Sequence, residues 1–213
     1  MKTLLAIAGC GPRLEIALAC PASPAPALVA LVGPTPRSDL IVAAIDLLLS
    51  GAGIGAADLE GVAASRGPGS FTGIRVALAT ALGIATAHGV SAHGYSSLLM
   101  QAARTEAGDL LAVQPARRGF VYAQAHAWRS GRPEPLAEPF VCPLADLASL
   151  ALPVVAPAGL QLPEDAPLAT TLRSSAEALL LLLAQEAQPD LASLVPAYLE
   201  PPSAQPPVRR AAL

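Results

Sequence analysis

Short apolar runs separated by glycine and proline open the chain. They lie at 3–8, 14–20 and 27–32, and their length and flanking turn residues predict three β-strands. The turn between the first two is Gly9-Cys10-Gly11-Pro12. Because the runs follow one another so closely, we expect an antiparallel meander at the start of the chain.

Helical spacing replaces this pattern after the third run. Ser38 is a suitable N-cap for a helix over 39–50, and Gly51 or Gly53 would end it. The apolar positions of this helix recur on one face: Leu40, Ala43, Ala44, Leu47 and Leu48.

A strand–helix–strand–helix order completes the first half of the chain. It comprises a strand at 61–65, a helix at 72–88, a strand at 90–93 and a helix capped by Ser96. These elements together with the meander predict a first lobe over 1–105.

A smaller second lobe is predicted over 106–200. Runs at 110–113 and 120–128 are typical of a β-pair, and 153–156 is a further short strand. The stretch at 201–213 is rich in proline, and we expect it to be disordered.

A capping box predicts the start of the last helix. Ser174 and Glu177 have the required spacing, and the helix is expected to run through Glu186. Its segment 178–184 is apolar all round, which predicts that it is buried or pressed against another surface.

A glycine-rich loop lies between the strand at 61–65 and the helix after it. Its residues are Arg66-Gly67-Pro68-Gly69-Ser70-Phe71-Thr72-Gly73, followed by Ile74 and Arg75. Glycine permits backbone angles closed to other residues, and we expect Thr72 to be the N-cap. Such a loop can present N–H groups to an anion or pack tightly under a partner.

Three familiar loop chemistries do not fit these residues. A Walker phosphate loop needs a lysine after its last glycine, but the only lysine in the chain is Lys2. The dinucleotide fingerprint needs a third glycine where Thr72 stands. Ser70 lacks the flanking glycines of a nucleophile elbow, so we expect Ser70 and Thr72 to cap the helix and no residue to be catalytic.

The loop from Gly67 to Arg75 resembles the GPGSFTGxR signature of the bacterial TsaB family, also called YeaZ. Three further segments resemble the GVSSL, DARRGEVY and PxYLR motifs of that family. They are, in order, Gly94-Tyr95-Ser96-Ser97-Leu98, Ala116-Arg117-Arg118-Gly119-x-Val121-Tyr122 and Pro196-Ala197-Tyr198-Leu199. The resemblance therefore covers most of the chain.

The resemblance implies an α/β fold of two lobes, actin/Hsp70/sugar-kinase-like and thus ribonuclease H-like, with a reduced second lobe. It implies a non-catalytic dimerisation subunit that binds and activates a TsaD-type catalytic paralogue. That paralogue threonylcarbamoylates the adenosine beside the tRNA anticodon. The resemblance also implies a TsaE-type ATPase docked across the pair, ATP or ADP only at the complex interface, homodimers when the paralogue is absent, and tRNA contact only through the complex.

The resemblance further implies that the helices near 39–50 and 72–88 form a helical-bundle interface. The expected partner-binding residues are Leu40, Ala44, Leu47, Leu48, Ile74, Arg75, Ala77, Leu78, Ala81, Leu82 and Ala85. We expect the apolar ones in the second helix to be exposed, since they exceed what one sheet face needs. Arg75 lies in a first helical turn, where a cation opposes the helix dipole, so we expect a carboxylate or phosphate partner for it.

Several positions depart from the family pattern. Ala8-Gly9-Cys10 stands where relatives have Asp-Thr-Ser after the first strand, and Pro115 replaces an aspartate. Phe120 and Glu200 replace a glutamate and an arginine, and a histidine is missing near Ser38. ATPases of this fold hold Mg²⁺ with acidic strand ends, so we expect no independent ATP hydrolysis. The alternative is a divergent ATPase or small-molecule kinase of the same fold.

Composition adds two constraints. Of the 213 residues, 53% are hydrophobic and only 14% are charged, which suggests surface hidden in a partner interface. The net charge of −3 argues against this chain as the main grip on tRNA, because phosphate binding needs a basic face.

Cysteine and histidine spacing predicts no metal site. Cys10, Cys20 and Cys142 show no metal-ligand spacing, and His88 and His93 are not on one helical face. Reduced thiols favour a cytoplasmic location, and the glycines and histidines after 88 interrupt the uncharged stretch too often for a membrane span. The alternative of an exported lipoprotein with Cys10 at the cleavage box has too short an apolar core.

Overall fold

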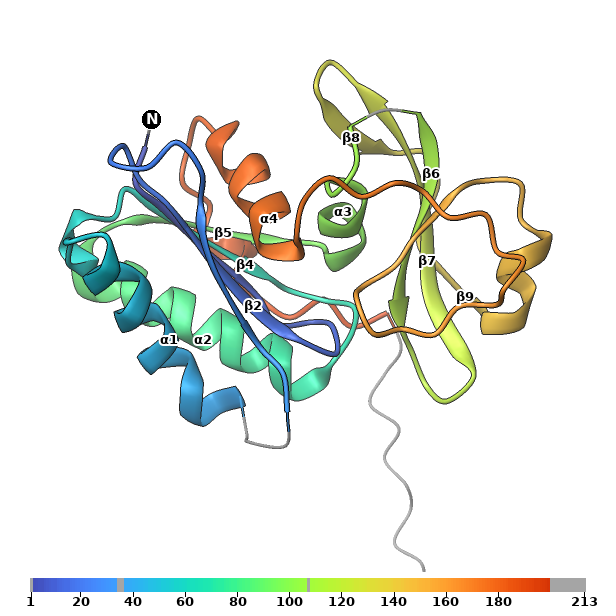
Figure 1. Ribbon diagram of the computed structural model, residues 1–213, viewed down its shortest axis with the longest axis horizontal. Coiled ribbons are helices and arrows are strands. Elements are labelled where there is room, and N and C mark those ends of the chain that lie inside the picture. The colour runs from blue at the N-terminus through green and yellow to red at the C-terminus, as the bar shows by residue number, and fades with distance from the viewer. Residues whose placement is uncertain (1, 34–36, 107, 200–213) are drawn as a thin grey trace, which may run out of the picture.

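The computed structural model describes residues 2–33, 37–106 and 108–199 and shows two lobes, each built on a five-stranded sheet (Figure 1). The first sheet has the order β3-β2-β1-β4-β5. The second has the order β10-β6-β7-β8, with β9 pairing with β7. The predicted two-lobed α/β fold is therefore confirmed.

The first three strands form the predicted antiparallel meander, and the next two add in parallel to its inner edge. All side chains of β1, β2 and β4 are buried, because helices cover both faces of the sheet. The strands are β1 (Leu4–Ala8), β2 (Leu14–Ala19), β3 (Ala27–Leu31), β4 (Gly61–Ser65) and β5 (Ser91–Tyr95).

Two long helices cover one face of this sheet, as Figure 1 shows: α1 (Arg37–Gly51) and α2 (Phe71–His88). A short 3-10 turn, η1 (Ala56–Asp58), lies between α1 and β4. Side chains of both helices interlock with β1, β2 and β4 in the largest core cluster of the molecule. By length and composition α2 could cross a membrane, yet one of its faces belongs to this core.

The opposite face of the first sheet is covered from the other end of the chain. Helix α4 (Ser175–Ala184) packs on β1, β2 and β4, and η3 (Leu191–Ser193) lies beside β5. The predicted second lobe at 106–200 therefore differs from the structure, in which the chain returns to the first lobe near Ser174. The apolar segment 178–184 is buried as predicted, since it meets the alanine-rich face of the sheet.

The second sheet is a small antiparallel sheet with one parallel edge strand. It encloses its own apolar cluster, to which η2 contributes Leu147. Its elements are β6 (Asp109–Pro115), β7 (Phe120–Arg129), β8 (Arg132–Pro135), β9 (Phe140–Pro143), η2 (Leu144–Ser149) and β10 (Val154–Val155). Sequence patterning predicted β6, β7 and β10 but missed β8 and β9, whose prolines are typical of turns.

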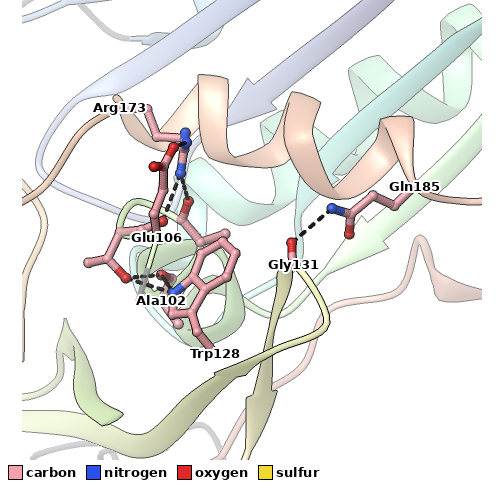
Figure 2. A network of polar contacts seen from close by, with 8 residues as sticks. Ala102, Glu106, Trp128, Gly131, Arg173 and Gln185 are labelled. Atoms are coloured by element: carbon pink, nitrogen blue, oxygen red, sulfur yellow. Dashed lines mark hydrogen bonds and ion pairs between the residues drawn. The ribbon is translucent and has the colours of Figure 1, made fainter. Parts of the chain in front are cut away.

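A polar junction joins the two lobes (Figure 2). The Arg173 guanidinium donates to the carbonyls of Ala103 and Thr105 at 3.0 and 2.7 Å and pairs with Glu106. The Trp128 indole N–H, on β7, donates to the Thr105 hydroxyl at 2.7 Å. The junction therefore binds the end of α3 (Ser97–Ala102) to the second sheet and to the segment that enters α4.

Two helix ends differ from prediction. The N-cap of α2 is Ser70, not Thr72: its hydroxyl accepts from the Gly73 N–H, and the helix starts at Phe71. The capping box of α4 is present as predicted, but the helix ends at Ala184 instead of Glu186. The predicted disordered tail at 201–213 lies outside the described residues.

Candidate partner interface and glycine loop

The glycine loop packs its backbone directly against the turn between β1 and β2. The Ser70 N–H donates to the Cys10 carbonyl at 2.8 Å. A Cβ on Gly69 would overlap that same carbonyl, and a Cβ on Gly73 would overlap the carbonyl of Gly9. Glycine is required at both positions because two backbones meet there without room for a side chain.

The other side of the loop contacts α3 and the C-terminal segment. The Ser97 N–H donates to the Gly67 carbonyl at 2.8 Å, and the Ser97 hydroxyl donates to the Pro68 carbonyl. The Ala197 N–H donates to the Arg66 carbonyl at 2.7 Å. Since the amides of Ser70 and Gly73 are also bonded within the protein, the loop serves to pack three segments together.

Within the described part of the chain, Arg75 contacts two aromatic side chains and no carboxylate. Its guanidinium carbon lies 4.0 Å from the centre of the Phe71 ring, and its Nε donates to the Tyr198 hydroxyl at 3.2 Å. The rings of Phe71 and Tyr198 stack with centroids 5.5 Å apart. A cation over an aromatic face offsets the unfavourable helix dipole, so no carboxylate is needed.

A cavity of about 330 Å³ separates the glycine loop from the second lobe. Cys10 and Pro115 both line it, and the family pattern given above has a serine and an aspartate at these two positions. Its other lining residues are also uncharged: Gly11, Pro12, Gly69, Ser70, Ala116 and Tyr122. Among the described residues, the lining of this cavity contains no carboxylate of the kind that holds Mg²⁺ and nucleotide in ATPases.

Cys10 is not a reactive thiol. It is 1% exposed, and burial raises the pKa of the thiol to about 11. The thiol therefore stays protonated at neutral pH and is a poor nucleophile. Cleavage before Cys10 would also remove β1, the central strand of the first sheet, so the structure does not support the lipoprotein alternative.

The histidines are dispersed. His88 ends α2, His93 lies on β5 beside the Tyr95 ring, and His126 is buried on β7. Burial lowers the pKa of His126, which is thereby kept neutral. Within the described ranges, no three His, Cys, Asp or Glu side chains lie close enough to hold a metal ion.

Most of the predicted partner-binding residues face inward, which corrects the expectation that the apolar ones in α2 are exposed. They pack on the sheet because the apolar stripe of each helix is the one that forms the core. The buried residues are Ala44, Leu48, Ile74, Ala77, Leu78, Ala81 and Ala85, while Leu40 is half-buried. Only Leu47, Arg75 and Leu82 are exposed among the predicted set.

The exposed side of the two helices nevertheless carries large apolar residues. Val42 and Leu47 of α1 are 60% and 65% exposed, and Phe71 and Leu82 of α2 are 48% and 45% exposed. Small exposed residues lie among them: Ala43, Ala79, Gly83 and Thr86. We call these eight residues the outward face. Val42 and Phe71 were missed, although apolar residues outside the inward stripe were the signal that could have identified them.

The sequence is similar to a known protein family and to uncharacterised mycobacterial proteins. A sequence model of the family described as TsaD, tRNA N6-adenosine threonylcarbamoyltransferase, matches residues 37–187. An uncharacterised protein of Mycobacterium leprae is 43% identical over 74 residues, which are 35% of this chain and 20% of that protein. An uncharacterised protein of Mycobacterium tuberculosis is 40% identical over 74 residues, 35% of each chain. The chain thus matches only a fifth to a third of the length of these relatives.

Solved structures share the fold. YeaZ from Pseudomonas aeruginosa superposes with a TM-score of 0.69 at 23% identity, over 93% of this chain and all of that one. A second Pseudomonas aeruginosa structure, described as similar to peptidase YeaZ, gives 0.73 at 21% identity over 94% and 100%.

The fold and the loop together define a two-lobed α/β protein of the YeaZ type, as the resemblance to that family predicted. Because the family model covers well over half of the chain, the chain belongs to the family described as TsaD, tRNA N6-adenosine threonylcarbamoyltransferase.

Proposed function

We propose that this chain is a non-catalytic subunit that binds and activates a TsaD-type catalytic subunit through the outward face. The observation that carries the proposal is the exposed side of α1 and α2, where small residues lie among Val42, Leu47 and Leu82. Small residues allow a second pair of helices to approach closely, and the leucines supply apolar area to bury.

The interlobe cavity supports the non-catalytic part of the proposal. Its described lining residues are uncharged, and Cys10 and Pro115 stand where the family pattern has a serine and an aspartate. A divergent ATPase would require a carboxylate for Mg²⁺ there. In our proposal any ATP or ADP is bound at the complex interface or by a TsaE-type ATPase, and tRNA is contacted through the catalytic subunit.

The test is co-purification with the TsaD-type paralogue, followed by size exclusion with light scattering. We expect a heterodimer with the wild type and its loss in Leu82→Asp, because a buried unpaired charge at an interface costs several kcal/mol. Leu78→Asp is not a suitable variant, since Leu78 is 4% exposed and the change would unfold the protein.

Leu136→Asp is the matched control. Leu136 is 45% exposed, as is Leu82, but it follows β8 in the second lobe. Heterodimer formation by Leu136→Asp and not by folded Leu82→Asp would support the outward face as the interface. A wild-type chain that does not bind the paralogue would refute the proposal, as would appreciable ATP hydrolysis by the isolated chain.

A further inference from the structure

Two aspartates of α1 border the outward face. Asp39 and Asp46 are both exposed, and about two helical turns separate them, so they lie on the same side of the helix as Val42 and Leu47. Helix α2 contains no acidic residue, and its Arg75 lies against an aromatic ring. Of the two helices, only α1 therefore brings negative charge to this face.

Asp39 has a local role in its helix. It lies in the first turn of α1, where the positive end of the helix dipole favours a carboxylate. The Ser38 hydroxyl also donates to its Oδ1 at 3.0 Å. The stability of α1 accounts for Asp39 without any partner.

Asp46 has no such role. It lies in the C-terminal half of α1, where a negative charge gains nothing from the dipole, and aspartate is among the weaker helix formers. Within the described part of the chain, no cation pairs with its carboxylate. The local energetics of the helix therefore do not explain an aspartate at this position.

Asp46 adjoins the residues that the proposed function would bury. Leu47 follows it in the sequence, and Val42 lies one turn before it on the same exposed side. A subunit that covers these two side chains would also displace water from the Asp46 carboxylate. A carboxylate that loses its water without gaining a cation weakens a complex, whereas a well-paired carboxylate adds to its specificity.

We propose that the subunit covering the outward face presents an arginine or a lysine to Asp46. The inference rests on the proposed function and specifies the chemistry of its partner: an apolar helix surface with a cation at the edge that lies beside α1. A second copy of this chain matches Asp46 less well. The one arginine among the described side chains of α1 and α2 is Arg75, and it is held by Phe71 and Tyr198.

The experiment measures the affinity of the full chain for the TsaD-type subunit by titration calorimetry at low and high salt. Asp46→Asn should raise the dissociation constant about 10-fold, and Asp46→Lys should raise it at least ~100-fold because two cations would meet. The affinity of the wild type should fall more steeply with salt than that of Asp46→Asn, since only the wild type keeps the ion pair.

Asp165→Lys is the matched control. Asp165 is an exposed carboxylate of the second lobe, and its replacement changes the net charge of the chain by the same amount as Asp46→Lys. We expect Asp165→Lys to bind like the wild type. Urea unfolding should show Asp46→Asn to be no less stable than the wild type, which separates a loss of binding from a loss of folding.

A charge-reversal scan of the TsaD-type subunit then identifies the cation. One arginine or lysine changed to glutamate there should restore the binding of Asp46→Lys, and a scan without any such rescue would overturn the inference.

Two further outcomes separate this inference from the proposed function. If Asp46→Lys binds like the wild type while Leu82→Asp does not bind, the inference is wrong and the proposed function stands. Equal losses in Asp46→Lys and Asp165→Lys would also overturn the inference, because net charge alone would explain them. A wild-type chain that does not bind the TsaD-type subunit would refute both.

Discussion

The glycine loop and the outward face differ in how distinctive their sequences are and in what their residues contact. The loop has the most distinctive sequence in the chain, yet its carbonyls and amides bind other parts of the protein. The outward face consists of ordinary apolar and small residues, which are exposed on α1 and α2 beside polar ones such as Asp46. A distinctive motif can therefore mark a packing requirement while the proposed binding surface lies beside it.

The largest expected effect is on the loop itself. Gly73→Ala should destabilise the fold by about 3 kcal/mol or more, because its Cβ would overlap the Gly9 carbonyl and the backbone must shift. Urea unfolding followed by circular dichroism measures the change.

Gly83 is the matched control in the same helix. It is exposed on α2 and a Cβ there meets nothing within 4 Å, so Gly83→Ala should be neutral or stabilising by up to about 1 kcal/mol. Equal destabilisation by the two substitutions would show that the loop has no special packing role.

The second prediction concerns the outward face, where a substitution should affect binding more than stability. Gly83→Leu should leave stability within about 1 kcal/mol of the wild type but weaken binding to the TsaD-type subunit by about 2 kcal/mol. The reason is that a leucine would hold apart two helices whose approach depends on small residues. Titration calorimetry measures the affinity, and unchanged binding would move the interface away from Gly83.

Lowering the pH should destabilise the protein through the buried His126, which belongs to neither the glycine loop nor the outward face. Burial lowers the pKa of His126 below its ordinary value of 6.5, so the unfolded chain takes up a proton at a higher pH than the folded one. Its contribution to stability is therefore intact above pH 6.5 and declines as the pH falls below it, by at most about 1.4 kcal/mol per pH unit.

His126→Gln isolates this contribution. Between pH 6.5 and 5, the unfolding free energy of the variant should fall less steeply with decreasing pH than that of the wild type. The test is this slope, because the substitution can also change the unfolding free energy at every pH. Parallel pH profiles for the two proteins would show that another group governs the acid response.

The fold was largely accessible from sequence, and the interface was not. Periodicity located the meander, α1, α2 and α4, because apolar stripes mark core faces directly. The same stripes misled the choice of interface residues, because Ile74 and Leu78 are apolar residues that pack in the core. The return of α4 to the first lobe was also hidden, because its partners on β1 lie about 170 residues earlier in the sequence.

The smallest expected effect lies where the two regions meet. Tyr198 stacks on Phe71 of the outward face and accepts from Arg75, while its neighbour Ala197 bonds to the loop. Tyr198→Phe keeps the stacked ring and removes one exposed hydrogen bond, so it should cost only about 0.5 kcal/mol of stability. Tyr198→Ala also removes the ring and should cost about 1 kcal/mol more. Equal losses in the two variants would assign the contact to the hydroxyl; the expected inequality would show that the ring joins the C-terminal segment to the outward face.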